Sequence, residues 1–475
     1  MIVELDEQAG EFAQRWRLEQ IVLRHSDFVG FPITITSSAQ ETKDSDLQDR
    51  VINRQTPLWR QQPSGVDQET YDEFYKHLTQ DLDPPLLASH MVVDIPVDIR
   101  SVLYVPARRQ RSALDPRADY GLRLYARGVL IQPNNKDLLP DYLRFVEGIV
   151  ESEDLPLNVS RETVQRNPAA RRIQRALLGK LVRDLKDLAQ SEPAKYAQFW
   201  SEFGAFIKEG VATDAATKHD LLPLLRFHSS KTADDEWVSL AEYVERAGED
   251  QPDIYYLLGE DLETIARSPH LDYFRAHDAE VLMLIDPIDS FLVAALSEYE
   301  DKALRNIDDA SLELPETEAQ KEQETEDEGD VLTVPDDQFG PLVARLMTTL
   351  GQRVTQVRES RVLREHPCRL VTPEGQPGRE MLYVYKLLNQ EYEIPAKILE
   401  INRRHALIRN LAQMVAQRAS DPVIEATIEQ MYENQLLIEG LHPNPSAMVP
   451  RLQRLMEAAT QPPPPPQPPT TQDGS

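Results

Sequence analysis

The chain has 475 residues, enough for about three domains at ~150 residues each, so it can bury sizeable hydrophobic cores. Its 51 lysines and arginines stand against 80 aspartates and glutamates, which gives a formal net charge of -29. Because so acidic a chain repels phosphate backbones and anionic lipid headgroups, we expect no nucleic-acid partner and no membrane partner.

The N-terminal residues 1–7 are acidic and lack the basic start and the apolar stretch of a secretory signal peptide. No run in the chain approaches the ~18 apolar residues of a membrane span, and the most apolar segment, 281–285, stops at Asp286. The single cysteine, Cys368, cannot form an intramolecular disulfide or a thiolate metal site, which fits a reducing compartment. These features predict a cytoplasmic protein.

Strands and helices alternate in the first half of the chain. Residues 99–105 and 122–131 are rich in Val, Leu, Ile and Tyr and are predicted strands, and a helix is predicted from about Asp141 to Glu151. Asn167 and Pro168 then begin a long helix, because asparagine is a good cap and proline fits the first helical position. The apolar stripe of this helix consists of Ile173, Leu177, Leu181, Leu185 and Leu188.

A second, smaller α/β part is predicted after a lapse in apolar periodicity between Gly210 and His219. Residues 254–258 are a predicted strand, residues 260–277 are largely helical, and residues 281–285 are a strand again. This order forms a β-α-β crossover, so the two strands should be parallel and covered by helices.

Two changes of composition divide the rest of the chain. Residues 308–330 contain eleven acidic residues and one lysine, so they are predicted to be a solvated, self-repelling linker. The last residues are rich in proline, which favours extended polyproline II, and are predicted to be a disordered tail or, alternatively, a ligand for an aromatic groove. The predicted segments are a large α/β part (1–215), a small βαβ part (216–307), the linker (308–330), an α+β part (331–458) and the tail (459–475).

Beyond the linker, residues 339–357 are a predicted helix, residues 398–401 a strand, and two further helices follow. Apolar residues recur near helical spacing on these two helices: Ile424, Ile428, Met431 and Ile438 on the first, and Met448, Leu452 and Leu455 on the second. Pairing with the same helices of a second copy would bury both stripes in a four-helix bundle, which predicts a two-fold dimer. The alternative is that the stripes pack onto their own domain.

Standard catalytic motifs are missing from the sequence. Gly179-Lys180 lacks the upstream glycine and the following Ser or Thr of a phosphate-binding loop, and no G-x-S-x-G, H-E-x-x-H or G-x-G-x-x-G motif occurs. His366 lies two residues from Cys368, but one thiol and one imidazole do not make a metal site, so no metal is predicted.

Residues 152–165 hold the one arrangement that suggests chemistry. Ser160 can cap a helical turn, and Arg161 follows it directly. A helix N-terminus already offers positive potential and free N–H groups, so an arginine there strengthens the attraction for an anion such as a terminal phosphate. The alternative is that Arg161 forms an ordinary ion pair with one of three nearby acids, Glu151, Glu153 or Asp154.

The run 152–165, SEDLPLNVSRETVQ, resembles the catalytic-loop signature of the heat-shock protein 90 chaperone family, in its bacterial form. Further segments resemble the family in the same order: Trp16-Arg17-Leu18, His25-Ser26-Asp27-Phe28, Phe31-Pro32-Ile33, Pro57-Leu58-Trp59, Tyr71 to Tyr75, Leu122-Arg123-Leu124-Tyr125, Ile254-Tyr255-Tyr256-Leu257, Pro287-Ile288-Asp289 and Leu399-Glu400-Ile401-Asn402. Ordered matches over roughly residues 1–458 are far more specific than one motif. They imply an α/β middle domain and an α+β C-terminal dimerisation domain.

The resemblance implies a chaperone that binds unfolded or partly folded client proteins as a homodimer and is driven by ATP. It implies that Arg161 reaches the γ-phosphate of ATP and that Gln165 positions it, with ATP and Mg as the cofactors of the intact family. The nucleotide-binding domain of the family has no counterpart in these residues. We therefore expect that this chain alone binds no cofactor and does not hydrolyse ATP. A dimeric structural scaffold without chaperone or ATPase activity is the alternative, and an autonomous enzyme is disfavoured by the missing motifs.

The resemblance also implies which residues contact clients. Residues 381–388 resemble an exposed amphipathic client helix, and Trp59 matches a tryptophan that faces clients in relatives. Flexible methionine and aromatic side chains suit a promiscuous surface. The expected contacts on the helix are Met381, Leu382, Tyr385 and Leu388. From the residues alone, the same segment is equally a buried helix or strand, and an isolated tryptophan is often a core residue.

Overall fold

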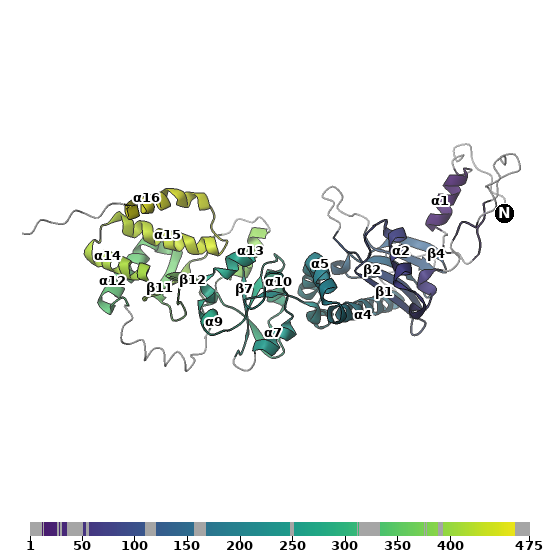
Figure 1. Cartoon of the computed structure of the whole chain (residues 1–475), viewed down its shortest axis with the longest axis horizontal. Helices are drawn as coiled ribbons and strands as arrows, with labels where there is room; N and C mark the ends of the chain where they lie inside the picture. The colour runs from purple at the N-terminus through teal and green to yellow at the C-terminus, as the bar shows by residue number, and fades with distance from the viewer. Residues whose placement is uncertain are drawn as a thin grey trace, which may run out of the picture. The chain divides into compact units, whose positions relative to one another are not determined.

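The computed structural model describes residues 12, 14–25, 28, 31–35, 51–53, 57–109, 120–155, 168–247, 251–310, 312, 333–374, 376, 378–387 and 393–460. They belong to two compact units, Met1–Leu225 and Arg226–Ser475 (Figure 1). The division between the units therefore lies a short distance after residue 215, where the sequence predicted it. Both units combine helices with β-sheets, which confirms the predicted α/β and α+β multi-domain class.

The first unit is built around a five-stranded mixed sheet with the strand order β1-β2-β5-β3-β4. Its strands are β1 (Leu87–Val93), β2 (Ile99–Val105), β3 (Leu122–Ala126), β4 (Val129–Asn135) and β5 (Glu147–Glu151). Its helices are α1 (Arg15–His25), α2 (Gln68–Thr79), α4 (Pro168–Ser191), α5 (Pro193–Thr213) and α6 (Lys218–Leu221), with short 3-10 helices at Leu58–Arg60, Pro63–Gly65, Asp141–Leu143 and Leu222–Leu224.

Helices α2 and α4 cover opposite faces of this sheet. Successive residues of a strand point to opposite faces, and β1 shows it: the Ser89 hydroxyl donates to Asp184 of α4, whereas the His90 ring lies 2.7 Å from the hydroxyl of Tyr71 in α2. The predicted stripe of α4 is buried throughout, as Ile173, Leu177, Leu181, Leu185 and Leu188 are each at most 4% exposed. This confirms the predicted long helix from Pro168.

The helix predicted from Asp141 to Glu151 is wrong. A single 3-10 turn is followed by β5, which pairs antiparallel with β2 and parallel with β3 in the middle of the sheet. A central strand is apolar on both faces, so its sequence does not alternate and periodicity cannot tell it from a buried helix. The strand predicted over 122–131 is instead a hairpin, turning at Arg127 and Gly128, which both have positive φ.

The second unit begins with a small α/β part, defined here as residues 226–310, whose five-stranded sheet has the order β6-β8-β7-β10-β9. Its strands are β6 (His228–Ser229), β7 (Ile254–Leu258), β8 (Val281–Leu284), β9 (Glu298–Tyr299) and β10 (Lys302–Asn306). Its helices are α7 (Leu240–Ala247), α8 (Leu262–Ala266), α9 (Asp272–Ala276) and α10 (Asp289–Ala295), with a 3-10 turn at Pro269–Leu271. Strands β7 and β8 are parallel and joined through α8 and α9, which confirms the predicted crossover.

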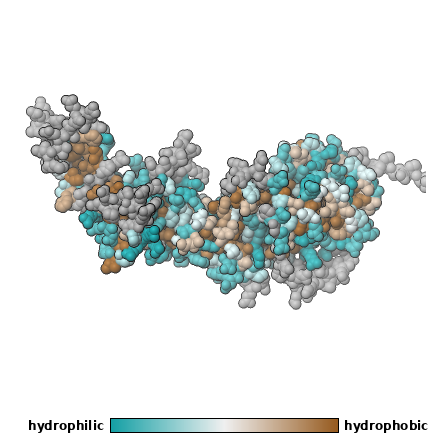
Figure 2. Space-filling model, turned by 180° about the vertical axis from the view of Figure 1, so that it is seen from behind, coloured by the Kyte–Doolittle hydropathy of each residue, from teal (hydrophilic) through white to brown (hydrophobic). Residues whose placement is uncertain are grey.

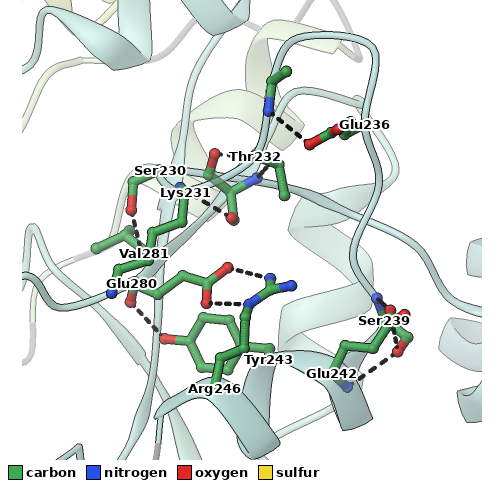
Figure 3. A network of polar contacts seen from close by, with 12 residues as sticks. Ser230, Lys231, Thr232, Glu236, Ser239, Glu242, Tyr243, Arg246, Glu280 and Val281 are labelled. Atoms are coloured by element: carbon green, nitrogen blue, oxygen red, sulfur yellow. Dashed lines mark hydrogen bonds and ion pairs between the residues drawn. The ribbon is translucent and has the colours of Figure 1, made fainter.

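A polar network fixes α7 against β8 (Figure 3). The Glu280 carboxylate is buried and accepts from Nε and Nη2 of Arg246 at 3.0 and 2.6 Å, while the Tyr243 hydroxyl donates to the Glu280 carbonyl at 2.6 Å. Ser239 and Glu242 form a reciprocal capping box at the start of the helix, with backbone-to-side-chain distances of 2.7 and 3.1 Å. Helix α7 is therefore held at its start and along its length.

The C-terminal part of the second unit, residues 333–460, has a three-stranded sheet with the order β11-β13-β12 and helices packed against it (Figure 1). Its strands are β11 (Val354–Glu359), β12 (Cys368–Val371) and β13 (Lys397–Ile401). Its helices are α12 (Asp336–Leu350), α13 (Arg379–Leu387), α14 (Ala406–Gln417), α15 (Pro422–Ile438) and α16 (Val449–Thr460), with 3-10 turns at Gly351–Arg353 and Pro445–Met448. The helix predicted to reach Val357 ends earlier because Gly351 adopts positive φ, and Val354 starts a strand.

The small α/β part and the C-terminal part are joined by buried polar contacts. Asp308, which is 1% exposed, accepts a hydrogen bond of 3.1 Å from the hydroxyl of Thr372, and the two backbones also pair. Asp308 is therefore packed, although the sequence predicted it to start a solvated linker; residues 313–332 and the tail from 461 lie outside the described residues.

Asp272 makes a second buried connection between the two parts. Its carboxylate accepts from the backbone N–H groups of Arg364, Glu365 and His366 and pairs with Nδ1 of His366 at 2.7 Å.

Within the described part of the chain there is no cluster of His, Cys, Asp and Glu that could hold a metal ion. Of the helices described, none has the length and apolar character needed to cross a bilayer.

Candidate functional site

Arg161 and Gln165 fall within residues 156–167, outside the described part of the chain. The structure does describe what lies on either side of this loop. Strand β5 leads into it through residues 152–155, and α4 starts directly after it at Pro168. The predicted catalytic loop is therefore flanked by two described elements, which we call its anchors: the end of β5 and the start of α4.

The first anchor is Glu151, the last residue of β5, whose side chain is fully buried. Its Oε2 accepts from the indole Nε1 of Trp59 and from Nε of Arg60, both at 2.7 Å. Its Oε1 accepts from Nη2 of Arg60 and from the backbone N–H of Gly128, both at 2.6 Å. Burial alone would raise the pKa of Glu151, but the hydrogen bonds from Arg60, Trp59 and Gly128 hold this pKa below its ordinary value.

These four donors bear on the ion-pair alternative for Arg161. An ionised carboxylate offers about four acceptor positions, and described donors already fill those of Glu151. Asp154 accepts one described hydrogen bond, from the backbone N–H of Asp98 at 2.8 Å, and both Asp154 and Glu153 are exposed. The ion-pair alternative for Arg161 therefore stays a prediction for these two exposed acids, and such exposed pairs contribute little.

The second anchor is the start of α4, which is positively charged. No acidic residue stands in the first turn of the helix, and Arg171, Arg172 and Arg175 are all exposed. Arg171 lies in the first turn, where a cation opposes the macrodipole and adds to the positive potential of the free N–H groups, and Arg172 and Arg175 follow on the next turns. These arginines were not among the residues predicted from the sequence, although their R-R-x-x-R spacing is visible in it.

Trp59 does not face a client. It is 0% exposed and lies in an aromatic cluster, with its ring centroid 4.5 Å from that of Phe28 and 5.2 Å from that of Tyr125. The predicted client-binding role of Trp59 is therefore contradicted by its burial. The core alternative holds instead, with the indole N–H satisfied by Glu151.

The segment predicted to bind clients forms helix α13, so its strand alternative is wrong. Met381 is 45% exposed, Leu382 is 1% exposed, and Tyr385 is half-buried against the C-terminal core. Leu388 lies outside the described residues. Of the described candidates, Met381 is thus the one that offers substantial apolar surface.

The stripes predicted to form a dimer divide into buried and exposed residues. Ile424, Ile428, Met431 and Met448 are at most 4% exposed, and the three on α15 belong to the hydrophobic core of their own domain. The own-domain alternative therefore holds for these residues. Ile438 and Leu455 are half-buried.

A different apolar row remains exposed on α15 and α16, which we call the α16 row. Its members and their exposed fractions are Leu437 (45%), Val449 (49%), Leu452 (39%) and Met456 (66%). On α16, Val449, Leu452 and Met456 follow the i, i+3, i+7 spacing of one helix face. Of these, Leu452 belongs to a stripe predicted from the sequence, whereas Leu437, Val449 and Met456 do not.

Ion pairs fix α16 on α15. Glu433 accepts from both Nη atoms of Arg451 at 2.7 and 3.1 Å, and the ring of His442 lies 3.5 Å from it. The hydrogen bond from Arg451 holds the pKa of Glu433 below its ordinary value. The α16 row is consequently presented by a pair of helices with a defined arrangement.

Comparison with known proteins identifies the class. Residues 43–467 match the family model described as Hsp90 protein, so the chain belongs to the Hsp90 family of chaperones. Within that family it is similar to bacterial proteins named "Chaperone protein HtpG", which confirms the resemblance to the bacterial type. The relative from Chlorobaculum tepidum is 38% identical over 466 residues, covering 96% of this chain and 70% of that protein. The relative from Nitratidesulfovibrio vulgaris is 36% identical over 460 residues, covering 95% and 69%.

Proposed function

We propose that this chain is a cytoplasmic chaperone that binds non-native client proteins as a homodimer. The observation that carries the proposal is the apolar surface that the second unit leaves exposed, on α13 and in the α16 row, in a chain of the Hsp90 family. Figure 2 shows that hydrophobic residues also reach the surface on α1, where Leu23 is 46% exposed. Trp16 on the same helix is 53% exposed.

Dimerisation would use the α16 row. Covering a large apolar side chain contributes about 1.5–3 kcal/mol, and four such residues on rigidly paired helices suit an isologous two-fold contact. The test is the double variant Leu452→Glu/Met456→Glu, measured by size exclusion with light scattering, which should turn a dimer into a monomer. Gln453→Glu, an exposed change on the same helix, is the matched control and should leave the mass unchanged.

Point variants are the sharper test here. Removing residues 421–475 would delete α15, whose Ile424 and Ile428 belong to the domain core, so the domain itself would be damaged. A monomeric mass from such a deletion would not distinguish loss of the interface from loss of the fold.

Client binding would use Met381, the exposed apolar residue among the described candidates on α13. Suppression of light scattering from an aggregating client should weaken in Met381→Glu, because a charge on this exposed position opposes contact with apolar polypeptide. A structural scaffold without chaperone activity would leave aggregation unchanged even with the wild-type chain. That outcome would contradict the proposed function.

For the ATP-driven cycle, we propose that Arg161 contacts the γ-phosphate and that Gln165 positions it, with ATP and Mg held by the nucleotide-binding domain of the family. The support is the saturated Glu151 carboxylate and the positive start of α4 on either side of the loop. An arginine in this role contributes ~10³–10⁵ in rate in GTPases. Calorimetric titration of this chain alone with Mg-ATP should show no binding; micromolar binding that Arg161→Ala abolishes would contradict the expectation.

A further inference from the structure

Glu380, in the first turn of α13, connects this helix to the sheet of the small α/β part. Its Oε1 accepts from the hydroxyl of Tyr256 in β7 at 2.9 Å and from Nδ2 of Asn306 in β10 at 2.7 Å. Tyr256 is 7% exposed, so the contact is made at the edge of a packed core. One carboxylate oxygen thus attaches the helix to two neighbouring strands.

The orientation of the Asn306 amide and the protonation of the Tyr256 hydroxyl both favour donation to Glu380. The Oδ1 of Asn306 accepts from the backbone N–H of Asp308 at 3.0 Å, which orients the amide so that Nδ2 points at Glu380. Burial, followed by the charge of Glu380, raises the pKa of Tyr256 well above its ordinary value, so the hydroxyl stays protonated and donates. Hydrogen bonds to a charged acceptor are about twice as strong as neutral ones.

The rest of α13 is held by apolar packing. Leu382 is 1% exposed in the core of the C-terminal part, and Tyr385 packs against the same core. Met381 points away and is 45% exposed. Among the described side chains of the helix, Met381 is therefore exposed, Leu382 is buried and Tyr385 is half-buried for as long as the helix stays in place.

The Glu380 side chain has room to leave its position. A cavity of about 580 Å³ lies beside it, lined by polar residues that include Asp253, Arg305 and Glu374. The adjacent Gly378 permits the observed conformation, because a Cβ there would lie 2.3 Å from Oε2 of Glu380. The Glu380 carboxylate therefore borders this polar cavity in its present position.

We propose that Glu380 is a latch that limits the client-binding surface of α13. While Tyr256 and Asn306 hold it, the helix presents Met381 and keeps Leu382 buried. When it is released, α13 moves away from the sheet, and Leu382 and Tyr385 join the surface that captures unfolded, apolar polypeptide. This inference rests on the proposed client-binding function of α13.

The latch is tested by hydrogen exchange of the peptide that covers residues 381–387, in the full chain. Tyr256→Phe removes one hydroxyl and keeps the buried ring, so it should speed exchange about tenfold, as expected for one charge-assisted hydrogen bond. Glu380→Ala removes the acceptor of both hydrogen bonds, so it should speed exchange by more than about tenfold. Glu374→Ala removes the same charge from the lining of the same cavity and should leave exchange unchanged. Unchanged exchange in both latch variants overturns the proposal.

The effect on capture is measured by suppression of client aggregation. Tyr256→Phe and Glu380→Ala should suppress it at a lower ratio of chain to client than the wild type, and Glu374→Ala should not. Faster exchange without stronger suppression overturns the link between the latch and capture. A wild-type chain that suppresses no aggregation contradicts the proposed function instead, and the exchange result then still decides whether the latch exists.

Discussion

The indole Nε1 of Trp59 donates a hydrogen bond of 2.7 Å to Oε2 of Glu151, and both side chains are 0% exposed. The contact joins a short 3-10 turn to the end of the central strand β5, immediately before the predicted catalytic loop. A tryptophan expected at the surface thus belongs to the framework from which that loop emerges.

Trp59→Phe should destabilise the first unit by about 2–5 kcal/mol. The variant leaves a buried carboxylate without one donor, which costs ~1.5–3 kcal/mol, and it also opens a cavity. Chemical denaturation followed by circular dichroism is the measurement, because it does not depend on tryptophan emission. Trp16→Phe, at a position that is 53% exposed, should change stability by less than about 0.5 kcal/mol. Equal effects in the two variants would contradict the assignment.

Two glycines should respond to alanine in opposite directions. Gly148 in β5 has φ +150°, and a Cβ there would lie 2.4 Å from the carbonyl oxygen of Val102, so Gly148→Ala should cost about 2–6 kcal/mol from backbone strain and steric clash. Gly179 lies inside α4 with open space around it, so Gly179→Ala should add about 0.5–1 kcal/mol. Denaturant midpoints decide both signs, and a stabilising Gly148→Ala would refute the central placement of β5.

The apolar residues of the last two helices should separate stability from assembly. Ile424→Ala should lower the free energy of unfolding by about 2–5 kcal/mol and leave the dimer contact intact, because Ile424 is 0% exposed in the core. Leu452→Ala should barely change the stability of the fold but weaken dimerisation, since Leu452 is 39% exposed. Unfolding curves and concentration-dependent light scattering measure the two effects. Weakened dimerisation in Ile424→Ala together with a large loss of stability in Leu452→Ala would contradict the assignment of Ile424 to the core and of Leu452 to the α16 row.

The Asp272–His366 pair should make the stability of the second unit depend on pH at both ends of the range. Burial works against it, but hydrogen bonds from His366 and from backbone N–H groups lower the pKa of Asp272 from 3.8 to about 2. Its contribution is therefore complete above pH 3.8 and is lost as the pH falls towards 2. The hydrogen bond to Asp272 raises the pKa of His366 above 6.5, so that contribution is complete below pH 6.5 and is lost as the pH rises through the raised pKa.

Urea unfolding between pH 2 and pH 9 tests this dependence. His366→Gln should remove the decline on the alkaline side. The decline in acid should remain, because the three backbone N–H groups still bind Asp272. A His366→Gln chain with an unaltered alkaline decline would show that another group is responsible.

Long amphipathic helices and several apolar strands could be predicted from the sequence, including the fully buried β7 and β13, but β5 could not. The stripe of α4 shows a clean helical period because one face is solvated, whereas β5 has the sequence EGIVE, with only two large apolar residues and no alternation. The end of α12 was predicted too late because apolar residues from Leu346 to Val357 keep near-helical spacing across the boundary, and Gly351 alone marks the change.

The sequence could predict which residue types carry the chemistry of the candidate site, but not which distant residues contact one another around it. The sequence pattern singles out Arg161 through its position after a capping residue, yet it cannot show that Glu151 is already occupied by Trp59, Arg60 and Gly128, which lie far away along the chain. Likewise, the stripe of α15 indicates an apolar face without indicating what covers it. Ile424 and Ile428 are covered by their own domain, and the apolar residues that stay exposed on the last two helices lie mainly on α16.

The buried joints between the small α/β part and the C-terminal part have a consequence for the acidic segment between them. Asp272 holds the loop of Arg364 to His366, Asp308 pairs with Thr372, and neither joint runs through residues 313–332. A protease that nicks the backbone in that segment should therefore yield two fragments that co-elute as one particle. They should separate only when denaturant or acid breaks the carboxylate contacts.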